Sequence, residues 1–213
     1  MNDIKKLRYS RLGPRVAEAL EKRNFEAYYF DNTEEARAKI LELIAPDASI
    51  GYGGSMTVNA LQLKEEFRAR GNQMIERDYA AGPEELLETE HACLNANWFL
   101  MSSNAISEDG QLINIDGRGN RVAALVYGPK NVLVVAGMNK VVKTAEDAFR
   151  RAKFTAAPEN MARFTQFKTP CAVTGTCSDC LSPDCICNQI VYTRRSFFPQ
   201  RIKVVLIGED LGL

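Results

Sequence analysis

The chain has 213 residues, enough for one substantial domain with its own hydrophobic core. Hydrophobic residues make up 46% and charged residues 25%, a composition that excludes a disordered or fibrous protein. The 27 basic residues balance the 27 acidic ones and form no basic stripe, so we do not expect a nucleic-acid-binding protein.

The N-terminal residues carry charges but are not followed by an apolar stretch, so they do not resemble a secretory signal. The longest apolar runs, at 132–137 and 204–208, have the length of strands and are too short to cross a bilayer. We therefore expect a cytoplasmic protein that does not enter a membrane. In a reducing compartment, clustered cysteines are more often metal ligands or redox thiols than disulfides.

The N-terminal half predicts helices that alternate with short strands. Apolar residues between Ile4 and Phe25 recur at helical spacing, and Gly13-Pro14 divides this segment into two short helices because Pro can open a helix. The strand at 49–52 runs into a glycine-rich turn and a helix that ends near Arg70. The other elements expected here are strands at 25–30, 74–76 and 98–102 and helices at 33–45 and 83–95.

The C-terminal half continues the alternation. A hairpin is expected at 107–115, with its turn at Glu108-Asp109-Gly110. The remaining elements are strands at 131–136 and 201–208 and helices at 144–153 and 160–167. This order predicts an α/β fold with a mostly parallel sheet flanked by helices, in a single domain spanning 1–213. The cysteine-rich segment 169–188 becomes a loop before the last strand.

The first candidate site is the glycine-rich turn between strand and helix, formed by Gly53, Gly54, Ser55 and Thr57. Such a turn lets backbone N–H groups approach an anion, and the two hydroxyls add polar contacts. It matches neither the Walker sequence nor the dinucleotide fingerprint. A tight turn with a helix cap explains the same residues equally well.

The second candidate is a set of polar residues that follow predicted strands. Asn104, Asn120 and Arg121 lie among glycines where α/β sheets bind ligands, and Asn139 and Lys140 directly follow the strand at 131–136. Hairpin turns and a solvated lysine are the alternatives. Arg121 is the hardest to explain as a turn residue, because a turn does not need its five donors.

The strongest signal comes from five cysteines in one segment: Cys171, Cys177, Cys180, Cys185 and Cys187. The C-x2-C pair within it can supply two thiolates to one metal from a tight loop. A tetrahedral zinc site or a four-cysteine iron–sulfur cluster needs four thiolates, so one cysteine is surplus. The spacing leaves open whether the metal is zinc or iron, and whether its role is structural or redox.

Several motifs in the same order resemble the LUD-domain family, the lactate-utilisation proteins, along nearly the whole chain. They are G-Y-G-G-S-M-T at 51–57, N-A-I-S-E-D-G-Q-L-I-N-I-D-G-R-G-N-R-V-A-A at 104–124, G-P-K-N-V-L-V-V-A-G-M-N-K at 128–140, A-A-P-E-N at 156–160, T-P-C-A-V-T-G-T-C-S-D-C at 169–180 and I-C-N at 186–188. The resemblance implies a fold related to sugar-phosphate isomerases and CoA transferases. It also implies a link to an iron–sulfur system that oxidises L-lactate to pyruvate.

The resemblance further implies a ligand set for the cysteine segment. It makes Cys171, Cys177, Cys180 and Cys187 the four metal ligands, with a [4Fe–4S] cluster slightly favoured over zinc. Cys185 is then the extra thiol, because the family usually carries an Arg there. A second departure is Asn59 and Leu61, where the family commonly has an acidic residue and a glycine, so an acid or base role at that turn is not expected.

Together these features predict a protein of lactate-linked redox metabolism. It would bind a small anionic metabolite at the glycine-rich turn, hold a metal or iron–sulfur centre, and work with iron–sulfur partner subunits of a lactate-oxidising system. Two alternatives remain: a non-catalytic, metal-stapled scaffold that docks a partner, and a stand-alone isomerase- or transferase-like enzyme suggested by fold analogy. The sequence leaves open whether the chain catalyses a reaction alone.

Overall fold

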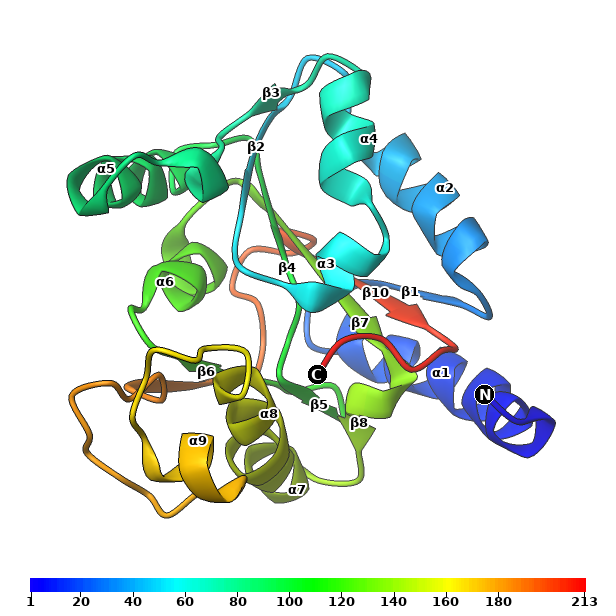
Figure 1. Cartoon of the computed structure of the whole chain (residues 1–213). Helices are drawn as coiled ribbons and strands as arrows, with labels where there is room; N and C mark the ends of the chain where they lie inside the picture. Colours follow the sequence, from blue (N-terminus) through cyan, green and yellow to red (C-terminus); the bar gives the residue numbers. More distant parts are fainter.

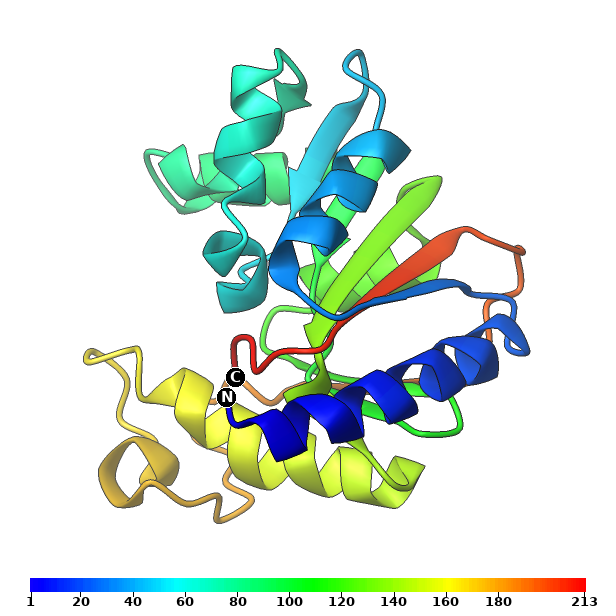
Figure 2. The same ribbon diagram turned by 90° about the vertical axis from the view of Figure 1, so that its right-hand side faces the viewer.

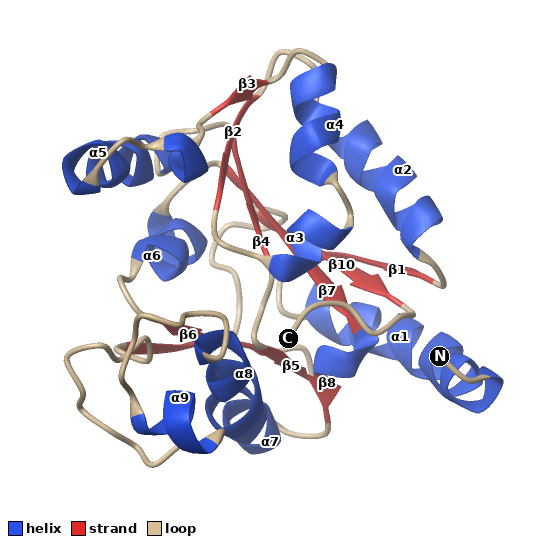
Figure 3. Cartoon of the chain, in the orientation of Figure 1, coloured by secondary structure: helices blue, strands red, loops and turns tan.

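The computed structural model describes all 213 residues and contains two β-sheets (Figure 3). The larger sheet has the strand order β1-β10-β7-β4-β2-β3, and every neighbouring pair in it is parallel. Its strands are β1 (Glu26–Phe30), β2 (Ser49–Tyr52), β3 (Gln73–Met74), β4 (Trp98–Met101), β7 (Asn131–Gly137) and β10 (Ile202–Ile207). The predicted α/β fold with a mostly parallel sheet is confirmed.

Helices cover both faces of this sheet. One face packs against α1 (Asp3–Glu21), α5 (Pro83–Cys93) and α6 (Asn120–Tyr127), and the other against α2 (Thr33–Leu43), α3 (Met56–Ala60) and α4 (Leu63–Ala69) (Figure 1). Successive residues of the central strands contribute to opposite cores, because side chains alternate along a strand. In β7, Val132 and Val134 face α1, whereas Leu133 and Val135 face α2. Burial on both sides explains the unbroken apolar runs in the sequence.

The second sheet has the order β8-β5-β6-β9 and lies beyond the carboxyl ends of the large sheet (Figure 2). It is formed by β5 (Ala105–Ser107), β6 (Leu112–Asp116), β8 (Val141–Val142) and β9 (Gln189–Thr193). It packs against α7 (Ala145–Arg151), which continues through a π-helical turn (Ala152–Ala156) into α8 (Ala157–Met161); α9 (Pro170–Thr174) follows. The hairpin expected from the sequence is the antiparallel β5-β6 pair of this second sheet. Strand β9 and the separation into two sheets were not predicted.

The prediction of two short N-terminal helices is wrong, because α1 runs continuously through Pro14. The buried residues Tyr9, Val16 and Leu20 give it one apolar face along its whole length. Gly13 serves packing: a Cβ there would lie 2.0 Å from Cδ2 of Tyr29, so only glycine lets the ring lie against the helix. Tertiary packing has overridden the local helix-breaking signal.

Three other helices differ from prediction. The helix expected to end near Arg70 is divided into α3 and α4 at Gln62, whose φ is 53°. The helix expected at 160–167 is absent. The helical segment that starts with α7 ends at Met161. The π-helical turn in this segment precedes Pro158, which has no N–H to donate to the hydrogen-bond pattern of an α-helix. Helix α6 was missed because it starts inside a glycine-rich segment.

None of the helices combines the length and the apolar character that crossing a membrane requires.

Replacement of Gly13 by Ala should lower the free energy of unfolding by about 1–3 kcal/mol, because the added methyl group overpacks against Tyr29. Denaturant unfolding would measure this loss. In a Tyr29→Ala background the same replacement should be neutral or stabilising, since Ala favours a helix over Gly by about 1 kcal/mol. Equal losses in both backgrounds would contradict the assignment.

Candidate functional site

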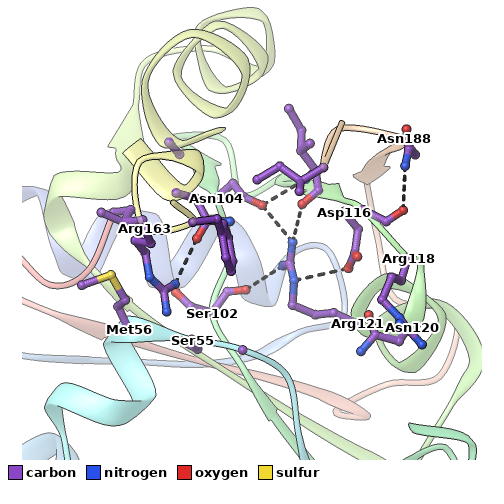
Figure 4. A pocket seen from close by; sticks show the side chains of 18 of the residues that line it. Ser55, Met56, Ser102, Asn104, Asp116, Arg118, Asn120, Arg121, Arg163 and Asn188 are labelled. Carbon is purple, nitrogen blue, oxygen red and sulfur yellow. Dashed lines mark hydrogen bonds and ion pairs between the residues drawn. The ribbon is translucent and has the colours of Figure 1, made fainter. Parts of the chain in front are cut away.

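A polar cavity of about 750 Å³ lies at the carboxyl ends of the parallel strands, between the two sheets. Ser55 follows β2, and Ser102 and Asn104 follow β4 (Figure 4). Lys140 follows β7, and all four residues line the cavity. Leu213, beyond β10, also lines it. Ligands of open α/β sheets bind in this position, because loops from neighbouring strands converge there.

The opposite wall comes from β6, the start of α6, residues 160–167 and the cysteine-rich loop. The cavity is lined by five cationic side chains and three acidic ones, which are Arg77, Arg118, Arg121, Lys140, Arg163, Asp78, Asp116 and Asp184. Two of the acids are already engaged: Asp78 pairs with Lys64 at 2.8 Å, and Asp184 accepts the backbone N–H of Lys168. The cavity therefore favours an anion.

Arg121 of α6 organises the floor of the cavity (Figure 4). Its Nη1 donates to the Ser102 carbonyl at 3.0 Å and to Asn114 Oδ1 at 2.6 Å. Its Nη2 donates to Asn104 Oδ1 at 2.9 Å and to the carbonyl of residue 115 at 2.7 Å, while Nε lies 3.5 Å from Asp116. Burial lowers the pKa of this guanidinium, which Asp116 partly offsets. Its donors are thus committed to protein acceptors.

A second arginine, Arg151 of α7, holds the same loops from the other side. Its Nη1 donates to the Asn104 carbonyl at 2.5 Å and its Nε to the Asn139 carbonyl at 3.1 Å. Burial lowers the pKa of Arg151 as well. Together Arg121 and Arg151 fix the segments that leave β4 and β7, and no sequence signal had pointed to Arg151.

Lys140 is the most unusual titratable group of the cavity. Only 4% of it is exposed, and no carboxylate lies within 4.0 Å of its Nζ, which instead donates to Ser102 Oγ at 3.0 Å and Thr57 Oγ1 at 3.1 Å. Burial, together with the positive charges of Arg151 and Arg121, lowers its pKa to about 7. At neutral pH this amine is therefore present in both protonation states.

The cations at one end of the cavity share a buried carboxylate. Glu90 of α5 pairs with Arg118 at 2.9 Å and Arg77 at 3.2 Å, and it accepts from Asn120 Nδ2 at 3.0 Å. Arg163 differs from them because it has no acidic partner and donates only to Asn160 Oδ1 at 3.0 Å. Arg163 is therefore the exposed cation with the most capacity to bind an anion.

The structure brings most of the predicted ligand-binding residues together. Gly54, Ser55, Asn104, Asn120, Arg121 and Lys140 line the cavity, whereas Gly53, Thr57 and Asn139 do not. Ser55 caps α3, with its Oγ accepting from the Val58 N–H at 3.2 Å. Gly53 backs onto Arg121, because a Cβ there would lie 3.2 Å from that side chain. Asn139 Oδ1 binds the N–H of Leu211 in the C-terminal segment.

Sequence reasoning missed several lining or supporting residues. Ser102 and Ser103 follow β4 directly, so the rule that sites form at strand ends could have found them. Glu90, Arg77 and Arg163 come from elements that carry no comparable signal.

The five cysteines of the loop line a second, smaller cavity of about 90 Å³ beside the first. All of them are free thiols. Burial, together with the neighbouring thiols of Cys185 and Cys177, raises the pKa of Cys187 to about 12. Cys185 and Ile186 line both cavities, so the cysteine pocket and the polar cavity share a wall.

The cysteine pocket suits a thiolate-bound centre by its donor chemistry, since five soft sulfur ligands face one enclosed space. No group of three or more His, Cys, Asp or Glu side chains is arranged as it stands to hold a metal ion. The loop would have to draw its sulfur atoms inward around a bound centre. The flank of the loop exposes the apolar side chains of Val173 and Leu181.

By fold and site the chain is an α/β protein with an anion-favouring cavity at the carboxyl edge of a parallel sheet and a cysteine pocket against that cavity. Its residues 14–207 match the LUD domain, so the chain belongs to the LUD-domain family. Among solved structures it is similar to a DUF162 family protein from Deinococcus radiodurans, with a TM-score of 0.53 and 13% identity over 93% of this chain and 98% of that chain. This likeness concerns the fold. Comparison with curated proteins gave no match.

Lys140 should make stability depend on pH. Its pKa is about 7 in the folded chain and 10.5 ordinarily, so between these values the unfolded chain binds more protons and the free energy of unfolding rises with pH. The rise is at most about 1.4 kcal/mol per pH unit. Denaturant unfolding between pH 7 and 9 should show a steeper rise for the wild type than for Lys140→Met. Parallel curves would refute the lowered pKa.

Proposed function

We propose that the chain binds a small anionic metabolite in the polar cavity and carries a thiolate-bound metal or iron–sulfur centre in the cysteine pocket. In this proposal it works in lactate-linked redox metabolism, as a subunit of a lactate-oxidising system. The observation that supports it most is the shared wall: Cys185 and Ile186 line both the cation-rich cavity and the pocket of five thiols.

The cavity supports the choice of an anionic metabolite through its uncompensated positive charge. Arg163 and Lys140 have no carboxylate partner, and Arg77 and Arg118 share the single carboxylate of Glu90. A carboxylate that enters the cavity would gain charge-assisted hydrogen bonds from a guanidinium. The volume of about 750 Å³ accommodates a metabolite together with water.

The cysteine pocket supports the redox part of the proposal. Cys171, Cys177, Cys180 and Cys187 are the proposed ligands, and a [4Fe–4S] cluster is favoured over zinc because of the family resemblance. Such a cluster supplies one-electron transfer when bound. Cys185, on the shared wall, is the thiol between the proposed centre and the metabolite.

The surface of the cysteine loop favours a partner protein. Leu181 is 99% exposed and Val173 is 83% exposed, although both are apolar. Exposed apolar side chains beside a proposed electron carrier suit contact with a partner subunit that accepts the electrons. The same observation supports the second candidate function, a non-catalytic scaffold whose loop docks a partner.

Replacement of Arg163 by Ala should weaken binding of L-lactate or pyruvate by roughly 1.5–3 kcal/mol, because one charge-assisted hydrogen bond is lost. Isothermal titration calorimetry would measure the change. Arg150→Ala is the matched control, since Arg150 is a surface arginine paired with Glu146 outside the cavity. Equal affinity in the wild type and both variants would remove Arg163 from the site.

Serine replacements should separate the five cysteines of the loop. Protein purified without oxygen should lose its metal on replacement of any of four cysteines, which are Cys171, Cys177, Cys180 and Cys187, and should keep it in Cys185→Ser. Metal analysis with an absorption spectrum distinguishes iron–sulfur from zinc.

Cys93→Ser provides the control, since Cys93 is buried between α5 and β2 and lies outside the cysteine pocket. Loss of metal in Cys185→Ser, with retention in one of the other four, would overturn the ligand set. Disulfides among these cysteines in the native protein would overturn the metal proposal itself.

A further inference from the structure

The hydrogen bonds around Lys140 account for two of the three positions on its amino nitrogen. The Thr57 hydroxyl donates to the Leu211 carbonyl, and the Ser102 hydroxyl donates to the Ser103 carbonyl. Both hydroxyl oxygens are therefore acceptors for Lys140, and Nζ uses two N–H bonds to reach them. The third position carries a proton when the amine is charged and a lone pair when it is neutral.

The surroundings favour the neutral form. The amino group is almost fully buried, no carboxylate pairs with it, and Arg121 and Arg151 repel a positive charge there. A lysine that served only as a cation would gain more from an acidic neighbour or from water. Burial beside other cations is instead an arrangement that activates lysine as a nucleophile.

We propose that Lys140 forms a covalent imine with a 2-oxo carboxylate bound in the polar cavity. The ketone is the group that an uncharged amine attacks, and the carboxylate is the group that Arg163 can bind at the same cavity. This inference rests on the proposed function, because it assigns the class of metabolite that the anion site takes. The sequence motifs by themselves do not indicate an imine at Lys140.

The reaction balances without an oxidant or reductant. The lone pair of Nζ forms a bond to the carbonyl carbon, and the carbonyl oxygen takes the π electrons and then a proton lost by the amine. Ser102 Oγ, which already accepts an N–H from Nζ, is placed to carry this proton. The nitrogen then loses its second proton to the resulting hydroxyl group, which leaves as water while the nitrogen lone pair forms the C=N bond. One amine and one ketone thus yield one imine and one water.

Reductive trapping tests the proposal directly. The full-length protein is incubated at pH 7.5 with pyruvate and sodium cyanoborohydride, which converts an imine into a stable secondary amine. Intact mass spectrometry should show one adduct per chain, and peptide mapping should locate it at Lys140. Lys140→Arg should lose the adduct.

Lys143→Arg is the matched control, because Lys143 is a nearby lysine whose side chain is 75% exposed and paired with Glu108. It should keep the full adduct yield. Because peptide mapping of the wild-type protein locates the modified residue, the result does not depend on how well any variant folds. An adduct spread over several surface lysines, or mapped to a residue other than Lys140, would overturn the proposal.

Calorimetry separates this inference from the function on which it rests. L-lactate has the carboxylate but no ketone, so it tests the anion site alone. If lactate and pyruvate both bind but pyruvate gives no adduct, the imine proposal fails and the anion site stands. If neither binds, the proposed function fails and the imine proposal fails with it.

Discussion

The guanidinium of Arg121, on a side chain that is only 12% exposed, makes the interactions on which the site depends. A charged group removed from water is tolerated only when its donors are all satisfied, since the cost of leaving a buried ion unpaired is several kcal/mol. Arg121 meets this condition by reaching across two sheets, to Ser102 after β4 and to Asn114 in β6. Its acceptors therefore hold the carboxyl edge of the large sheet at one position against the small sheet.

This constraint explains how the pKa of Lys140 comes to be lowered inside the cavity. Arg121 holds the Ser102 carbonyl and Arg151 holds the Asn139 carbonyl. Lys140, which follows Asn139 in the chain, is thereby placed near both arginines. Both arginines donate hydrogen bonds to protein acceptors. Their positive charges also help to lower the pKa of the neighbouring Lys140 amine.

The cysteine loop is attached to the same framework. Asn188 donates its backbone N–H to the Asp116 carbonyl and its Nδ2 to the Gly117 carbonyl, each at 3.0 Å, and β9 then pairs with β6. Gly117 allows close approach, since a Cβ there would lie 3.2 Å from the backbone of Ile186. Because β6 also carries Asn114 and Asp116 toward Arg121, one strand connects the cysteine pocket to the polar cavity.

Local sequence was sufficient for the parts of the protein that local chemistry decides. The apolar run of β7 is buried on both faces, as a parallel strand must be, and the glycine-rich turn after β2 stands between a strand and a capped helix, as its residues predict. The five cysteines of the loop line one pocket, and their closeness in the sequence was sufficient to indicate it. What the sequence could not determine were features that depend on packing between elements: the continuity of α1 through Pro14, which its buried apolar face supports, and the role of Arg121, whose acceptors come from the segment after β4 and from β6. The state of Lys140 belongs to this group as well, since burial and the two arginines act on it only after the two sheets have packed together.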